Sequence, residues 1–99
     1  MKARGNNLEI GSIKIRRIDG DRHLKAMVSM VLDGAFAVHD MKIIAGQDRL
    51  FLAMPSKRLA DGGFRDIVHP IDPNTRGMLE RLVLDEYSRT DAQGDDDRF

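Results

Sequence analysis

Apolar and polar residues alternate with a period of two along most of the first half of the chain. The alternation runs through 10–18 and again through 24–32, and such a period is typical of a strand with one buried face. A turn is predicted over 19–21, between the two runs, and Asp33-Gly34 follows the second run. Asp33-Gly34 predicts a tight hairpin, because glycine accepts a positive φ at little cost.

Three more strands are predicted before the C-terminal part of the chain. Within 36–44 the apolar positions fall one residue out of step at His39-Asp40, and a β-bulge there would restore the alternation. A short apolar strand is predicted over 50–54, and a brief edge strand over 64–68.

The pattern changes to a helical one after Asp72. Asp72 is a favourable N-cap and Pro73 a favourable first helical residue, and the helix is expected to end near Arg89. Five of six residues at helical spacing are expected to line a stripe that faces the core, the six being Thr75, Met78, Leu79, Leu82, Val83 and Glu86. Opposite-charge pairs four residues apart are expected on the outer surface, namely Arg76/Glu80, Arg81/Asp85 and Asp85/Arg89.

The order of these elements predicts an α+β domain, an antiparallel β-sheet meander with one C-terminal helix. The chain has 99 residues, which suits a single domain. We assign the domain to 10–89, a flexible leader to 1–9 and a disordered acidic tail to 90–99. One helix leaves a sheet face and the sheet edges uncovered, and an open edge favours a homodimer that extends the sheet.

The charge of the chain is unevenly distributed. The whole chain has 16 basic and 16 acidic residues, and the last ten residues contain four aspartates and one arginine. Residues 1–89 therefore hold 15 basic and 12 acidic residues, a net charge of +3. This mild excess permits a local basic surface, which matters more for binding a polyanion than the overall sum.

Several classes of protein are disfavoured by composition. No apolar run is long enough to span a bilayer, and no apolar segment follows the charged N-terminus, so neither a membrane protein nor a signal peptide is expected. The chain contains no cysteine, which excludes disulfides and fits a cytoplasmic location.

The sequence shows no constellation typical of an enzyme, a cofactor site or a metal site. His23, His39 and His69 do not have a known ligand spacing, and His39 is expected to cap the bulge by a hydrogen bond. Ser56 and Lys57 are neighbours, so on an extended segment their side chains point apart and do not form a catalytic dyad. We expect no catalysis, no cofactor, no metal and no small-molecule substrate.

Two sets of cations are candidates for binding nucleic acid. The first is Lys57, Arg58, Arg65 and Arg76. Arg76 stands in the first turn of the helix, where the helix dipole disfavours a cation, and an external phosphate would explain it. The four cations either converge on one concave anion-binding surface or are solvated charges balanced by Asp61, Asp66 and Asp72, and the spacing alone leaves both open.

The second set lies on the first two strands. It consists of Lys14, Arg16, Arg17, Arg22 and Lys25, and a solvated sheet face explains it better than a ligand does. Aromatic residues are few, and Phe36 and Phe51 are expected in the core. Little aromatic surface remains for stacking on bases, so phosphate contacts are favoured over a single-strand platform.

Five segments resemble the SpoVG family (stage V sporulation protein G, a septation regulator). They lie at 14–17, 36–44, 50–58, 63–71 and 75–77. The segment Phe-Leu-Ala-Met-Pro-Ser-Lys-Arg, which ends at Arg58, is the most specific of them, and the resemblance extends over about 10–89. The length of the N-terminal leader and the acidic tail depart from the family pattern.

The resemblance implies a bacterial homodimer that joins two sheets and regulates gene expression by binding DNA, and in some members RNA. The processes implied are septation in cell division, sporulation and virulence or capsule formation. The implied nucleic-acid-binding residues are Lys57 and Arg58, together with Arg65. The alternative is a protein–protein adaptor in cell division that does not bind nucleic acid directly.

Overall fold

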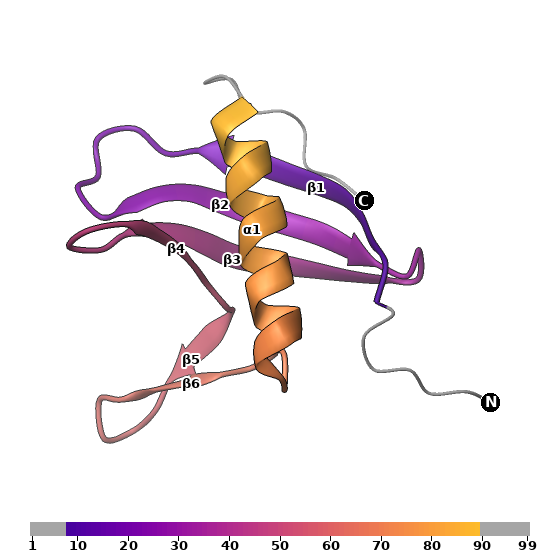
Figure 1. The fold of residues 1–99 in the computed structure, drawn as a ribbon. Helices are drawn as coiled ribbons and strands as arrows, with labels where there is room; N and C mark the ends of the chain where they lie inside the picture. The colour runs from indigo at the N-terminus through magenta and orange to yellow at the C-terminus, as the bar shows by residue number, and fades with distance from the viewer. Residues whose placement is uncertain (1–7, 90–99) are drawn as a thin grey trace.

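A four-stranded antiparallel sheet crossed by one helix forms the body of the molecule in the computed structural model (Figure 1), which describes residues 8–89. The sheet has the order β1-β2-β3-β4, a smaller two-stranded sheet follows it, and the helix α1 comes last. The predicted α+β meander with a C-terminal helix is confirmed. The bounds are β1 Ile10–Arg17, β2 Leu24–Leu32, β3 Phe36–Ala45, β4 Leu50–Ala53, β5 Ser56–Arg58, β6 Phe64–Asp66 and α1 Pro73–Arg89.

The predicted tight turn joins β2 to β3. Asp33 and Gly34 have φ angles of 53° and 61°, and the Ala35 amide donates to the Leu32 carbonyl at 3.0 Å. Two positive φ angles in succession define the primed turn that matches the twist of a hairpin. The Asp33 carboxylate also accepts a hydrogen bond from the Glu9 amide at 2.8 Å.

The predicted bulge is present in β3. Ser29 of β2 lies opposite two residues of β3, because Val28 pairs with Met41 while Met30 pairs with Val38. One of the two residues, Asp40, has a φ of 69°. Ser29 Oγ and His39 Nδ1 are 3.0 Å apart, so the expected capping of the bulge by His39 is confirmed.

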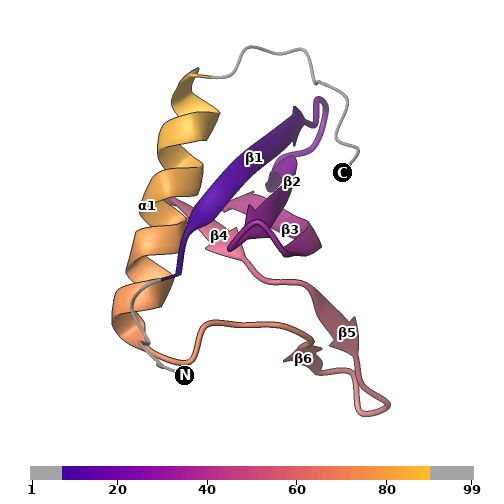
Figure 2. The same ribbon diagram turned by 90° about the vertical axis from the view of Figure 1, so that its right-hand side faces the viewer.

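The core lies between α1 and one face of the sheet (Figure 2). Alternate residues of the strands provide its sheet side, and α1 contributes Leu79 and Val83, both buried. The buried apolar residues of the strands and the segment after β4 are Ile15, Ala26, Val28, Met30, Met41, Ile43, Leu52 and Met54. The opposite face of the sheet, which no described helix covers, is called the open face below.

Three apolar residues expected in the core lie elsewhere. Phe36 is 71% exposed, because β3 begins beside a turn that extends past α1 (Figure 1). Phe51 is half-buried on the open face, since its neighbour Leu52 points into the core. Leu82 is 37% exposed, because α1 turns Leu79, Val83 and Tyr87 toward the sheet instead.

Glu80 of α1 covers the outer edge of β4. Its Oε2 accepts a hydrogen bond from the Leu52 amide at 3.0 Å, and its Oε1 accepts one from Arg49 at 2.8 Å. The predicted Arg76/Glu80 pair on the outer surface is therefore replaced by a contact between the helix and the sheet. At the end of α1, Arg89 pairs with Glu86 at 2.9 Å instead of with Asp85.

The environment of Glu80 favours its ionised form. Partial burial raises the pKa of this carboxyl, but the hydrogen bonds from Arg49 and the Leu52 amide and the charges of Arg49 and Arg76 outweigh burial. The pKa of Glu80 is therefore lowered, and the ionised carboxylate stabilises the folded state.

Most of the predicted leader and the whole of the predicted acidic tail lie outside the described residues, and only Leu8 and Glu9 of the leader lie within them. Within 8–89, no helix combines the length and the apolar character needed to cross a membrane.

Shortening a fully buried side chain tests the core. We expect Ile43→Ala to lower the free energy of unfolding by about 2–5 kcal/mol, because the lost contacts leave a cavity between the sheet and α1. Phe36→Ala serves as the control and should change it by no more than about 0.5 kcal/mol, since the ring is mostly in solvent. Urea unfolding measures both, and equal losses in the two variants would contradict the assigned core.

Neutralising Glu80 tests the contact between α1 and β4. We expect Glu80→Gln to lower the free energy of unfolding at pH 7 by about 1–2 kcal/mol, because charge-assisted hydrogen bonds are lost. Since folding lowers the pKa of Glu80, its contribution is complete above the ordinary value of 4.5 and is lost as the pH falls through the folded pKa.

Urea unfolding between pH 7 and pH 3 measures the difference between the wild type and this variant. The difference should shrink at the acidic end of the series. Asp85→Asn, on the exposed side of α1, is the matched control and should have little effect at any pH. A difference that stays constant down to pH 3 would refute the role of the ionised carboxylate.

Candidate nucleic-acid interface

A short hairpin, β5–β6, follows the sheet and carries three of the predicted cations. Lys57 pairs with Arg65, and Arg58 pairs with Phe64. The connecting loop closes through two hydrogen bonds between Leu59 and the glycine pair, and Gly62 has a φ of 93°. The strand β5 was missed in the sequence because the segment reads as a loop, although an Asp-Gly-Gly turn between two short polar runs is a usable hairpin signal.

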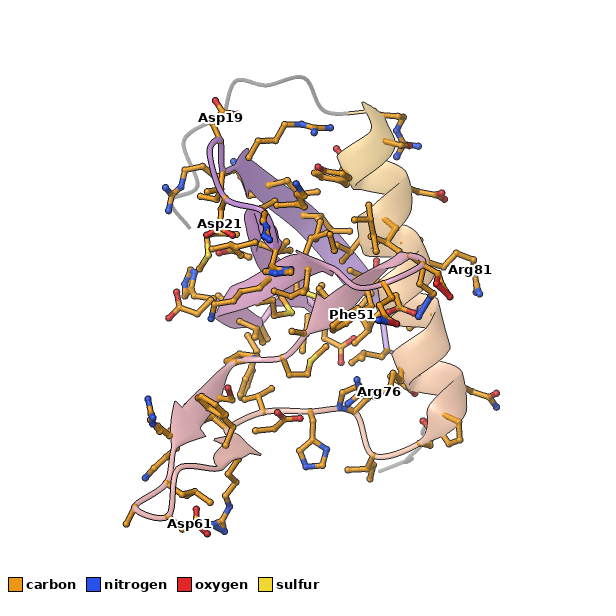
Figure 3. All side chains as sticks on the ribbon, turned by 90° about the vertical axis from the view of Figure 1, so that its left-hand side faces the viewer. Asp19, Asp21, Phe51, Asp61, Arg76 and Arg81 are labelled. Atoms are coloured by element: carbon orange, nitrogen blue, oxygen red, sulfur yellow. The ribbon has the colours of Figure 1, made fainter. Side chains whose placement is uncertain are left out.

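The hairpin is anchored at its base and exposed along its length. The Ile67 amide donates to the Pro55 carbonyl at 2.8 Å, and Pro55 is buried. Between Ser56 and Asp66 every residue except Leu59 is exposed. The hairpin leaves the body on the side of the sheet away from α1 (Figures 2 and 3), so it is accessible to a large ligand.

Lys57 and Arg65 lie directly opposite each other on one side of the hairpin. Like charges in that position cost stability unless an anion relieves them. The ion pairs within 8–89 are Arg49–Glu80 and Arg89–Glu86, so no described carboxylate forms an ion pair with either cation. The arrangement favours binding of an external anion.

Arg58 projects from the other side of the hairpin, because successive residues of a strand point to opposite faces. Its guanidinium carbon is 5.8 Å from the centroid of the Phe64 ring, which is a cation–π distance, and Phe64 is 68% exposed. The predicted adjacent cations Lys57 and Arg58 thus serve opposite sides of one ribbon.

Arg76 is not part of this cluster. It belongs to the first turns of α1, well away from the hairpin tip at Asp61 (Figure 3), and its charge acts on Glu80. The N-terminus of α1 is capped as predicted, since Asp72 accepts hydrogen bonds from the Thr75 amide at 3.3 Å and the Thr75 hydroxyl at 3.2 Å. The structure therefore brings together three of the four predicted site residues.

The second predicted basic set is divided between the two faces of the sheet. The Arg17 guanidinium lies 3.9 Å from the Tyr87 ring centroid and donates to the Tyr87 carbonyl at 2.6 Å, so Arg17 fastens the end of α1 to β1. Arg16 is exposed and projects to the open face. Lys25 donates to the Asp21 carbonyl at 3.4 Å.

Asp21 organises the turn between β1 and β2. Its carboxylate accepts hydrogen bonds from the amides of Leu24 and His23, both at 2.9 Å. Those two bonds are the main reason that the pKa of Asp21 is lowered. The carboxylate thus stabilises the turn that positions Lys25.

The residues considered for catalysis and metal binding are not brought together into a site in the described part of the chain. Ser56 and Lys57 are successive residues of β5, so their side chains point apart as expected. Among the residues from 8 to 89, His, Asp and Glu do not gather in groups of three that could hold a metal ion.

An apolar cavity of about 130 Å³ opens between the sheet and the first half of α1. Met41, Met54 and Leu79 contribute to its wall, and Val68 lies at its rim. Two exposed residues follow the hairpin nearby in the chain, Ile67 and Ile71, the latter 92% exposed. This surface was not predicted, and it is suited to an apolar side chain of a protein partner.

Comparison with known proteins identifies relatives of the chain. The family model SpoVG matches residues 8–89. Proteins with the name "Putative septation protein SpoVG" are 48% identical in Bacillus subtilis (strain 168), over 83% of this chain and 84% of that protein, and 45% identical in Clostridium perfringens (strain SM101 / Type A), over 83% and 91%. Another from Acetivibrio thermocellus is 48% identical over 81% of this chain and 85% of its own. The chain belongs to the SpoVG family of septation proteins.

Proposed function

We propose that the chain is a regulator that binds nucleic acid, mainly duplex DNA, through the hairpin β5–β6, and so affects septation, sporulation or other gene expression. The observation that carries the proposal is the exposed pair Lys57 and Arg65, which face each other without an ion-pair partner in the described part of the chain. Phosphate groups would relieve their repulsion, and family membership supports the link to septation.

The shape of the hairpin favours duplex DNA over RNA. A two-stranded ribbon fits the major groove of B-form DNA, whereas the major groove of an RNA duplex is too deep and narrow for side chains to read. Lys57 with Arg65 on one side and Arg58 on the other would reach phosphates on both walls of the groove. RNA remains the second ligand, with contacts to its backbone.

A homodimer formed through β1 would bring two hairpins to one DNA duplex. Glu80 occupies the outer edge of β4, which leaves β1 as the edge for pairing with a second copy. Antiparallel pairing of β1 with its copy gives eight strands, about 34 Å across at about 4.8 Å per strand. That span is close to one turn of DNA, the spacing of half-sites read by dimeric proteins.

Removing the hairpin cations tests the proposed binding site. We expect Lys57→Ala with Arg58→Ala to weaken binding to duplex DNA about tenfold or more at 0.1 M salt. The slope of log K against log salt should become shallower by about two per protomer, and so by about four for a dimer on one duplex, since about one ion is released per phosphate contact. Fluorescence anisotropy across a salt titration measures both quantities.

The single variants of the same residues distinguish a hairpin that is inserted into the major groove from one that lies flat on the DNA surface. Insertion predicts that Lys57→Ala and Arg58→Ala each flatten the salt slope by about one per protomer, because each contacts one wall of the groove. Arg81→Ala with Arg89→Ala removes the same charge from the middle and the C-terminal end of α1 and should leave the slope unchanged. An unaltered slope in the hairpin double variant would overturn the site.

Single cysteines test the dimer, because the chain has no cysteine of its own. We expect Ser12→Cys, Lys14→Cys or Arg16→Cys to give an oxidised dimer at the position nearest the two-fold axis. Asp48→Cys, in the turn before β4, should not. Non-reducing gels and sedimentation velocity measure the outcome, and a monomer at every tested concentration would contradict the dimer.

A protein–protein adaptor is the second candidate function, and the apolar cavity beside Val68 favours it. Ile71→Ser should then abolish capture of a protein partner from cell extract while DNA binding is retained. Capture that survives nuclease treatment would support the adaptor, and capture that is lost with nuclease would support nucleic acid as the bridge.

A further inference from the structure

The open face of the sheet is cationic. Lys14 and Arg16 of β1, Lys25 of β2 and Lys42 of β3 alternate with core residues and so project to this face. The strands β1, β2 and β4 contain no acidic residue, and β3 contains only Asp40, at the bulge. Positive charge therefore dominates the side of the sheet that α1 leaves uncovered.

One row of residues across the sheet shows how the charges are spaced. Arg16 pairs with Met27, Met27 pairs with Lys42, and Lys42 pairs with Ala53. Arg16 and Lys42 are two strands apart, which places their backbones about 10 Å from each other. An apolar methionine separates them, so the two cations form a spaced pair on a ridge of half-buried apolar side chains.

These two cations are not used by the fold. The ion pairs within 8–89 join other residues, and among the described residues the side chains of Arg16 and Lys42 form no hydrogen bond. This contrasts with Arg17, which is fixed on Tyr87, and with Lys25, which contacts the Asp21 carbonyl. Arg16 and Lys42 are therefore available for an external anion.

A second copy of the chain is a poor occupant for this face. Packing two open faces together would oppose like charges across the interface, which disfavours association. The hairpin β5–β6 leaves the body on the same side of the sheet (Figures 2 and 3). A long polyanion held by the hairpin would thus also pass the open face.

We propose that the open face is a second phosphate-binding surface, in which Arg16 and Lys42 contact the backbone of the same nucleic acid that the hairpin binds. This inference rests on the proposed function and adds a site to it. In the dimer through β1, the two-fold axis is perpendicular to the sheet, because antiparallel pairing keeps equivalent faces on the same side. Arg16 and Lys14 of both copies then border the axis in one continuous surface.

The test replaces both cations by neutral residues of similar length. We expect Arg16→Gln with Lys42→Gln to weaken binding to a 24-base-pair duplex about tenfold or more at 0.1 M salt, and to flatten the salt slope by about two per protomer. The matched control is Arg81→Gln with Arg89→Gln, which should bind as the wild type does. Arg16→Lys with Lys42→Arg keeps the charge and should also retain affinity.

The hairpin variant Lys57→Ala with Arg58→Ala is measured beside it and separates the two ideas. Loss in both variants supports both sites, and loss in the open-face variant alone supports this inference while refuting the hairpin site. Loss in the hairpin variant alone overturns the open-face site and leaves the proposed function standing. Equal loss in the charge-retaining variant would show a packing defect and overturn it as well.

The acidic segment 90–99 is the competing occupant of the open face, and deleting it completes the test. If the deletion strengthens DNA binding in the wild type, and Arg16→Gln with Lys42→Gln strengthens it equally, the face holds the segment and the inference is overturned. If the open-face variant remains weaker with the segment deleted, the inference is supported.

Discussion

The bulge in β3 fixes which residues of the sheet are buried and which are free to bind. Ser29 lies opposite two residues there, and Asp40 adopts a positive φ, which costs a non-glycine residue about 1 kcal/mol or more. If the same residues formed a regular strand without the bulge, the side chains beyond that point would swap faces. Met41 would then point to solvent, and Lys42 would enter the core under α1. The conformational cost at Asp40 is smaller than the cost of exposing Met41 and burying the charge of Lys42.

A single helix can cover only one face of a four-stranded sheet. The open face and the edges of the sheet must therefore be protected by other contacts or stay exposed. Glu80 shields the edge of β4 and Arg17 holds the C-terminal end of α1 against β1. The hairpin β5–β6 gains almost no cover from this core. A free two-stranded hairpin is marginally stable in water, so its anchor at Pro55 and any bound ligand contribute a large share of its order.

Local rules were sufficient for the sheet and insufficient for the site. The turn at Asp33-Gly34 and the bulge depend on residue type and period, which the sequence displays directly. The rotation of α1 depends on which of its neighbouring apolar residues meets the sheet; the predicted stripe included Leu82, whereas Tyr87 packs against the core instead. Arg76 was placed with the hairpin because its position opposed the helix dipole, but it lies on α1, where its charge acts on Glu80 from a distance while Arg49 forms the ion pair with that carboxylate.

The alternation of faces also explains why counting cations is a poor guide to function here. Arg16 and Arg17 are neighbours, yet one faces solvent and the other lies on Tyr87. Lys57 and Arg58 are likewise neighbours on opposite sides of a ribbon. Cations that fasten the helix cannot also hold a phosphate, because their donors are already directed to protein acceptors. A chain with no net charge can therefore present a cationic surface. This requires that cations without a protein partner lie on one side of the fold and that few acidic residues lie on that side.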